Sequence, residues 1–342
     1  MTGCADMEPP PINKVNASAA YRATERSFCP LRFACRKIVL VWLAALASLV
    51  LTSESGSAAP QVIVYCAQDQ VYGEPIFQQF EKQTNIKVRS VYDNEAVKTV
   101  AIANRLLAER HHPVCDVFWG NEEMRTRQLA AQHVFRETNG WAAFGYRSRR
   151  LVVNTNQLSL GSVPQSLFEL TNRTWRGKLA LAYPQFGTTA TYFQVLRQHW
   201  GDKLWTAWCR GLAANTPLLV DGNSEVVKAV GRGDAWVGLT DSDDIADGQR
   251  EGLPVMAMPM SRDTLLIPNT VAIIRDAPHP GAAQALYDFL QSREVIYRLL
   301  AARAIEGAST GDITLPTLQV DWPRVLDAAK ATTSELNQIF LR

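Results

Sequence analysis

The segment Trp236–Gly248 of the 342-residue chain, WVGLTDSDDIADG, carries four carboxylates directly after an apolar run. These carboxylates are Asp241, Asp243, Asp244 and Asp247. Carboxylate oxygens can hold a metal ion or an organic cation, and they can also cap a helix by accepting hydrogen bonds from its first N–H groups. An EF-hand loop counted from Asp241 is excluded, because Ile245 and Gly252 stand where that loop needs oxygen ligands. Four carboxylates exceed what a cap needs, so a binding site is predicted, with a capped helix as the alternative.

Polar residues also follow other apolar runs that predict strands, and ligands of open α/β sheets bind beyond the carboxyl ends of strands. The segment from Gly187 adds a helix start, whose free N–H groups can hold an anion or be capped in the ordinary way. The predicted ligand-binding residues are Gln68, Asp69, Asn121, Glu122, Gly187, Thr188, Thr189, Asn223, Asp241, Asp243 and Asp244.

Two common enzyme motifs are missing from the sequence. No HExxH or Walker pattern occurs, and no nucleophile stands beside a base. The segment GRGDAW has Trp236 where a dinucleotide fingerprint needs its third glycine. His111 and His112 are adjacent in sequence and diverge in space, which disfavours a metal site. We therefore predict no catalytic residue, no catalytic cofactor and no enzymatic activity.

The elements that must position these residues follow a repeating pattern. Short runs rich in β-branched residues, such as QVIVYC at 61–66, alternate with amphipathic segments such as 95–110. Alternation of strands and helices predicts parallel sheets covered by helices, which is the α/β class. Two such units occur in tandem.

The connections between the two units predict two lobes. The chain leaves the first unit near Leu151–Thr155 and returns to it near Pro259–Pro268. We predict a first lobe of residues 59–152 plus 266–342 and a second lobe of residues 153–265. Two crossings form a hinge, and the cleft between the lobes is the expected site.

The first 58 residues have a different character. Residues 1–37 are predicted to be disordered or to reflect a start codon placed too early, and they end in a positively charged n-region. Residues 38–58 supply the apolar and small-residue regions of a signal peptide, with cleavage after Ala58 and export to the periplasm. The apolar run Ile38–Leu51 is shorter than the roughly 20 residues that span a membrane. An uncleaved anchor is the alternative.

Charge and cysteine content limit the partners. Residues 1–58 hold six of the 35 Lys and Arg and four of the 33 Asp and Glu, so 29 of each sign remain after cleavage. A neutral chain without a basic tract is a poor ligand for nucleic acid. Of the three remaining cysteines, Cys66 and Cys115 stand at opposite ends of parallel strands, which predicts no disulfide between them, and Cys209 leaves an odd count.

Several segments together resemble one known family. VIVYCAQDQ, CDVFWGNE, WRGKLALAYPQFGTTAT and IPNTVAIIRDAPHPGAAQALYDFLQS are similar, in this order, to segments of periplasmic solute-binding proteins of ABC importers, in the ferric-iron-binding branch. The resemblance covers nearly all of the chain after the leader. It implies a two-lobed periplasmic-binding-protein fold of type II, with two doubly wound α/β lobes. It also implies a monomer that captures a small solute or metal ion and delivers it to a membrane permease.

The resemblance carries over to the site only in part. Iron-binding members place a histidine where this chain has Asp69, and an adjacent pair of tyrosines where it has Asp243 and Asp244. Ferric iron accepts carboxylate oxygens, so the resemblance implies ferric iron or a ferric–anion complex as transported ligand. The implied metal ligands are Asp69, Asp243 and Asp244.

Two further positions bear on the implied ligand. The carboxylate that follows the third strand in the family falls at Asn121, with Glu122 next to it. The residues that hold the accompanying anion match Gly187 and Thr188, and this feature is kept.

An organic cation is the alternative ligand, for example a polyamine or an aminophosphonate. Aromatic rings could surround such a cation through cation–π contacts, although rings of this kind also build cores. The candidate rings are Trp119, Tyr183, Phe186, Tyr192 and Trp236. A metal-assisted hydrolase of the cell envelope is the more remote alternative.

Overall fold

The computed structural model describes residues 59–93, 98–138 and 140–341, which fall within one compact unit, Ala58–Arg342. The predicted leader, residues 1–58, lies outside the described residues. None of the described helices is both long enough and apolar enough to span a membrane.

The first part of the chain forms three parallel strands connected by helices, as predicted, and their order in the sheet is β2-β1-β3. The strands are β1 (Gln61–Cys66), β2 (Lys87–Val91) and β3 (Val117–Gly120), and the connecting helices are α2 (Gln70–Thr84), α3 (Lys98–Glu109) and α4 (Glu123–Ala131). Val62 and Val64 point to one face of β1, where Phe77 and Phe80 of α2 cover them in a shared core. Tyr65 points to the other face, where Ile102 and Leu106 of α3 join it in a second core, so the near-continuous apolar run of β1 matches its position between helices on both faces.

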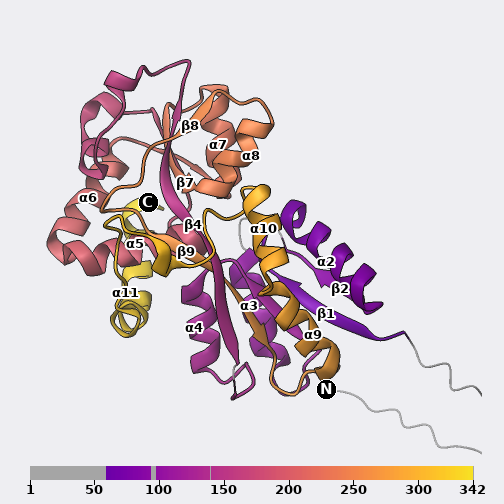
Figure 1. Ribbon diagram of the computed structural model, residues 1–342. Helices are drawn as coiled ribbons and strands as arrows, with labels where there is room; N and C mark the ends of the chain where they lie inside the picture. The colour runs from indigo at the N-terminus through magenta and orange to yellow at the C-terminus, as the bar shows by residue number, and fades with distance from the viewer. Residues whose placement is uncertain (1–58, 94–97, 139, 342) are drawn as a thin grey trace, which may run out of the picture. The chain divides into compact units, whose positions relative to one another are not determined.

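One long strand, β4 (Trp141–Asn154), connects this part of the fold to the rest (Figure 1). Its first half pairs antiparallel with β9 (Leu266–Ile273), and its second half pairs with β7 (Val237–Asp241) and β8 (Val255–Ala257). The predicted crossing near Leu151–Thr155 is therefore mostly part of a regular strand, and the predicted boundary after residue 152 falls inside it.

We divide the sheet into two sides. The β1 side consists of β2, β1, β3, β9 and the first half of β4. The β7 side consists of the second half of β4 with β7, β8 and the two strands β5 and β6 described next. On the β7 side, β5 (Leu179–Ala182) pairs in parallel with β6 (Leu218–Val220) and with β7. The helices of this side are α5 (Gly187–Trp200), α6 (Asp202–Ala214), α7 (Asn223–Arg232) and α8 (Ser242–Arg250). Short 3-10 turns lie in the connections at Leu160–Ser162, Leu167–Thr171, Arg173–Trp175 and Thr310–Asp312.

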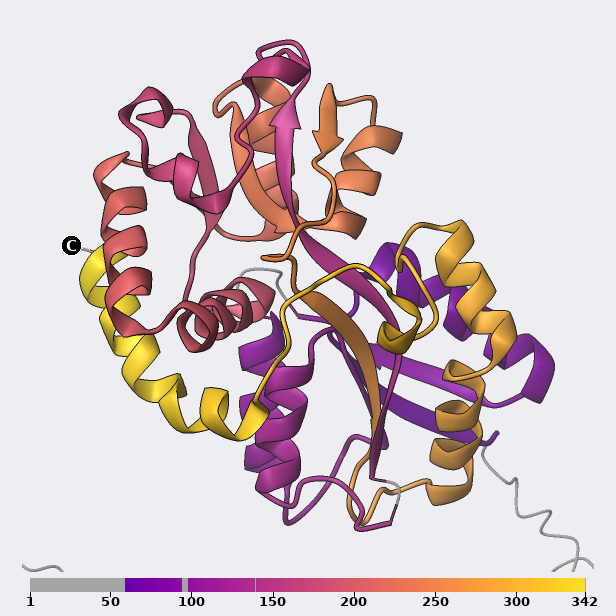
Figure 2. The same cartoon turned by 60° about the vertical axis from the view of Figure 1, so that its left-hand side comes forward.

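The last third of the chain returns to the β1 side and then leaves it again. Helices α9 (Pro280–Leu290) and α10 (Arg293–Ala301) pack on the β1 side. Helix α11 (Trp322–Phe340) lies against α5 and α6 (Figure 2). Its buried Leu336 joins the core of the β7 side. The predicted first lobe includes this helix, whereas its main packing partners lie within the predicted second lobe.

Cys66, Cys115 and Cys209 are buried, and none of these three described cysteines forms a disulfide. The prediction that Cys66 and Cys115 form no disulfide is confirmed.

Candidate functional site

Asp241 is the last residue of β7 and lies opposite Arg149 of β4. Nη1 of Arg149 donates to Oδ1 of Asp241 over 2.8 Å, and the Thr188 hydroxyl donates to Oδ2 over 2.7 Å. Nδ2 of Asn223 donates to the same Oδ2 over 3.1 Å. Burial alone would raise the pKa of the Asp241 carboxyl, but Arg149, Arg147 and the Thr188 hydroxyl hold that pKa below its ordinary value.

Two helix starts meet at this carboxylate. Thr188 and Thr189 lie in the first turn of α5, and Asn223 begins α7. Oδ1 of Asn223 accepts from Nη1 of Arg149 over 2.8 Å and from the Thr189 hydroxyl over 3.3 Å. The structure thus brings together Thr188, Thr189, Asn223 and Asp241, which the sequence predicts as site residues. The Thr188 hydroxyl is engaged by a carboxylate of the protein, and an anion at this helix start stays a prediction.

Asp243 and Asp244 stand in the first turn of α8, directly after Asp241. The three residues offer carboxylate oxygens that all lie within 4.8 Å of one another. Nε of Arg147 lies 3.2 Å from Oδ1 of Asp243 and 3.5 Å from Oδ2 of Asp241. Burial raises the pKa of Asp243 to about 7, with Arg147 opposing the shift and with Asp241 and Asp69 adding to it.

Two buried arginines are thus part of the site, although neither is among the site residues predicted from the sequence. Arg147 and Arg149 are two residues apart on β4, so both side chains point to the same face of the strand. The sequence did carry a signal for them, because the two arginines stand two positions apart just before an apolar run. We call Asp69, Arg147, Arg149, Asp241, Asp243 and Asp244 the charged cluster. Its four carboxylates outnumber its two guanidinium groups, so the cluster keeps an excess of negative charge when all are ionised.

The β1 side contributes the predicted residues Gln68, Asp69, Asn121 and Glu122. Gln68 is fully buried. Asp69 precedes α2, and its charge raises the pKa of both Asp243 and Arg147. Asn121 is half-buried beyond the end of β3. Glu122 has another role, because it caps α4 by accepting from the N–H of Arg125 and also accepts from the hydroxyl of Thr191 in α5.

Helix α2 of the β1 side contacts the start of α8. The Tyr72 hydroxyl donates to the backbone carbonyl of Asp243 over 3.3 Å and accepts from Nη2 of Arg250 over 2.7 Å. Arg250 also pairs with Asp247, which is 40% exposed. Asp247 is therefore outside the charged cluster, as its position one turn further along α8 predicts.

A capped helix explains only part of this arrangement. Asp241 occupies the position before α8, yet its side chain makes no capping hydrogen bond. Asp243 and Asp244 do match the helix dipole in the first turn. The side chain of Asp241 is instead committed to Arg149, Thr188 and Asn223.

The aromatic rings proposed as walls for an organic cation mostly have other contacts. Trp119 is buried against Phe144. Tyr192 lies under Arg149 and donates to the carbonyl of Asp263, and Trp236 is covered by Lys178. Phe186, by contrast, is 37% exposed just before Gly187.

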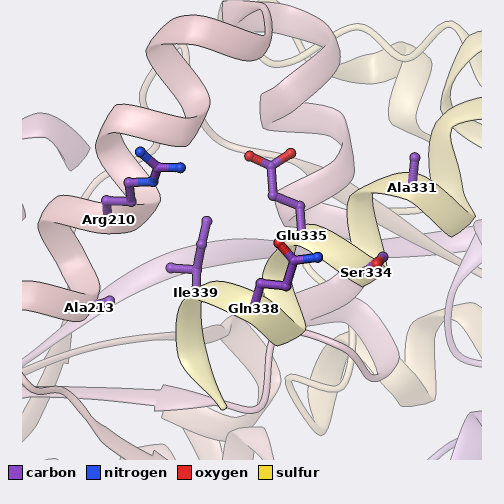
Figure 3. Close-up of a pocket in the computed structure, with 7 residues that line it drawn as sticks. All are labelled: Arg210, Ala213, Ala331, Ser334, Glu335, Gln338 and Ile339. Carbon is purple, nitrogen blue, oxygen red and sulfur yellow. The ribbon is translucent and has the colours of Figure 1, made fainter. Parts of the chain in front are cut away.

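A hollow of about 740 Å³ between α6 and α11 is separate from the charged cluster (Figure 3). Arg210 and Glu335 face it from the two helices. Glu335 is already bound by Thr206 and Arg197. None of the residues that line this hollow belongs to the predicted site.

The raised pKa of Asp243 predicts how the stability of the ligand-free protein depends on pH. An ordinary aspartate titrates near 3.8, so between this value and about 7 the folded protein holds a proton that the unfolded chain has lost. The free energy of unfolding should therefore fall as the pH rises through this range. Urea unfolding of the wild type and of Asp243→Asn measures this effect. The free energy of unfolding of the variant should increase relative to that of the wild type as the pH rises. A difference that is constant from about pH 5 to about pH 8 would contradict the assignment.

Residues 62–297 match the family described as bacterial extracellular solute-binding proteins. The chain is 27% identical over 215 residues to the Fe(3+)-binding periplasmic protein of Serratia marcescens. This match covers 58% of the chain and 61% of that relative.

Two solved structures show the likeness in fold. The iron-bound HitA protein of Pseudomonas aeruginosa has a TM-score of 0.70 at 17% identity, covering 81% of this chain and 99% of HitA. The AfuA protein of Actinobacillus pleuropneumoniae, with fructose-6-phosphate bound, has a TM-score of 0.68 at 18% identity, covering 83% and 99% of the two chains. At these identities the likeness shows the fold alone. It confirms the predicted periplasmic-binding-protein fold of type II.

Proposed function

Because this chain belongs to the bacterial extracellular solute-binding proteins, we propose that it is the substrate-binding component of an ABC importer. In this role it captures a small solute in the periplasm and delivers it to a permease in the inner membrane. The family is one of binding proteins, which supports a role without catalysis. We also propose that the protein acts as a monomer.

The arrangement of carboxylates supports a cationic ligand. Oxygens of Asp241, Asp243 and Asp244 lie within 4.8 Å of one another, and Arg147 and Arg149 do not balance all the carboxylates of the cluster. Like charges at this separation repel, so a bound cation would stabilise the cluster. Ferric iron, alone or with an anion, is the first candidate, because the relatives described above include iron-binding proteins.

A protonated organic amine is the second candidate, and one observation favours it. Arg149, Thr188 and Asn223 already bind the oxygens of Asp241, which reduces what this carboxylate can offer to a metal. An amine needs fewer oxygens than a ferric ion and can be held by Asp243, Asp244 and Asp69. An aminophosphonate could in addition place its anionic group at the start of α5.

We propose that the ligand is bound between two lobes that open and close. The contacts of Tyr72 with Asp243 and Arg250 connect the β1 side to the β7 side beside the charged cluster. These two contacts are polar hydrogen bonds, which water can replace when they break. The long strand β4 and the connection from β8 to β9, residues 258–265, join the two sides and would bend as the hinge.

A thermal-shift screen of residues 59–342 tests the proposed function. Ferric citrate, divalent metal ions, polyamines and aminophosphonates are added separately, and at least one cation is expected to raise the melting temperature strongly. A ligand at 100 times its dissociation constant adds about 2.7 kcal/mol of stability. Asp247→Asn should respond like the wild type, because Asp247 faces solvent. A screen in which no cation stabilises the wild type would refute the proposal of a cationic ligand.

A further inference from the structure

Three buried amide side chains have no hydrogen-bonding partner for either their oxygen or their nitrogen. They are Gln68, Gln185 and Asn269, the only amides of this kind in the part of the chain that the structure describes. Leaving a buried polar group without a partner costs about 1–3 kcal/mol, so folded proteins contain few such groups. Three amides with this property require a physical explanation.

Two of the three amides adjoin predicted site residues in sequence. Gln68 immediately precedes Asp69, whose charge acts on Arg147 and Asp243. Gln185 stands two residues before Gly187, where α5 begins.

Strand register places the third amide on the same face of the sheet. Asn269 of β9 lies opposite Phe144 of β4, so the two side chains share a face. Phe144 packs on Trp119, with ring centroids 5.8 Å apart. Trp119 lies opposite Cys66, two residues before Gln68. The indole Nε1 of Trp119 is also buried without a hydrogen-bonding partner.

The same face continues into the charged cluster. Ile267, two residues from Asn269 on β9, lies opposite Arg147 of β4. Arg149 follows two residues later, opposite Asp241 of β7. Trp119 and Asn269 therefore lie on the face of the sheet that carries Arg147 and Arg149, towards its β1 side, and Gln68 adjoins Asp69 of the cluster in sequence.

Two other buried amides do find partners. Asn215 is 2% exposed, and its Nδ2 donates to the carbonyls of Leu170 and Asn172 over 2.8 Å each. Asn154 is equally buried and donates to the carbonyl of Val230 while accepting from two backbone N–H groups. Gln194 lacks a partner for its oxygen alone, whereas Gln68 and Asn269 lack partners for both side-chain atoms.

Resting on the proposed capture of a cation, we propose that the ligand carries hydroxyl groups next to its cationic centre. A primary amide has two N–H donors and an accepting oxygen, and a hydroxyl group both donates and accepts. Gln68 and Asn269 would each exchange hydrogen bonds with such hydroxyls, and Trp119 would donate one. The ligand is then a hydroxyl-bearing organic molecule that is itself cationic or that chelates a metal ion, and not a bare ion.

Two matched pairs of probes distinguish these sources of hydroxyl groups. Glucosamine and cyclohexylamine are both ring amines, with and without hydroxyls, whereas ferric citrate and ferric nitrilotriacetate are ferric chelates with and without a hydroxyl. Calorimetric titration of wild-type protein should show about ten-fold or greater preference for the hydroxylated member of one pair, as expected when a site's buried polar groups would otherwise stay unpaired. Gln68→Met and Asn269→Leu should each reduce this preference several-fold.

Stability provides an independent readout for the same variants. Replacing an unpartnered buried amide by an apolar side chain of similar size should leave the melting temperature of the ligand-free protein unchanged or raise it. Asn215→Leu is the matched control, and its melting temperature should fall because two carbonyls lose their donor. A fall of similar size in Gln68→Met and Asn269→Leu would show that these amides serve the fold, and it would overturn the inference.

The outcomes separate this inference from the proposed function. Equal affinity of the wild type for both members of each pair, unchanged in the variants, would overturn the inference and leave cation capture standing. Binding of no cation by the wild type would overturn both.

Discussion

Replacing Arg149 by methionine is expected to lower the free energy of unfolding by about 3–5 kcal/mol, because it removes the closer of the two guanidinium groups that pair with the buried carboxylate of Asp241. The side chain of Arg149 is fully buried, and Nη1 pairs with Asp241 over 2.8 Å. The same guanidinium holds the side chain of Asn223 and the carbonyl of Leu239. Methionine fills similar space but supplies neither charge nor donors. Urea unfolding of the wild type and the variant at neutral pH measures the difference.

An exposed ion pair of similar length provides the control for Arg149. Arg232 pairs with Asp234 over 2.9 Å, with both side chains at least half exposed, so Arg232→Met should cost less than about 1 kcal/mol. The double variant Arg149→Met/Asp241→Leu should regain much of the lost stability, since it removes the uncompensated charge. Equal losses in Arg149→Met and Arg232→Met would contradict the role of the buried pair.

The sequence predicted the parts of the fold that depend on local pattern. The apolar run at Gln61–Cys66 forms β1, and the helix that follows it forms with Ile76, Phe77 and Phe80 buried. Strand β4 could not be recognised in this way. Its residues belong to two cores, and its pairing shifts between Phe144 and Tyr146, where Gly145 has a positive φ of 58°. No single alternation of apolar and polar residues therefore extends along this strand.

The candidate site was predictable where it depends on strand ends. Asp241 ends β7, Asp243 lies two residues beyond it, and Thr188 lies at the start of the helix after β5, so the structure gathers them as that rule requires. Arg149 stands in the middle of β4 and meets Asp241 across 92 positions of sequence. Only the pairing of β4 with β7 brings these two residues together, and the sequence does not specify that pairing. The packing of α11 on α5 escaped prediction for the same reason, because an amphipathic pattern shows that a face is buried but not against which helix.

Replacing Asp243 by asparagine is expected to weaken the binding of a cationic ligand by at least about 100-fold, since removing one partner of a desolvated charge pair costs about 3–5 kcal/mol. Asp243 is buried next to Asp241 and Asp244, and its oxygen lies 3.2 Å from Nε of Arg147. Asparagine keeps the shape of the side chain and removes its charge. Calorimetric titration with the cation that stabilises the wild type most in the thermal-shift screen measures the loss.

The stability of the same variant separates a ligand from a helix cap. In the ligand-free wild type, burial raises the pKa of the Asp243 carboxyl to about 7. Ionising this carboxyl at neutral pH therefore costs free energy that an asparagine side chain does not cost. Asp243→Asn should therefore melt at the same temperature as the wild type or higher, although it binds more weakly. Asp247→Asn should change neither quantity by much, because Asp247 is exposed and paired with Arg250. If Asp243→Asn instead lowers the melting temperature and leaves the affinity intact, the carboxylate serves only to start α8. A variant that melts no lower than the wild type but binds the cation more weakly would therefore assign Asp243 to the ligand-binding site.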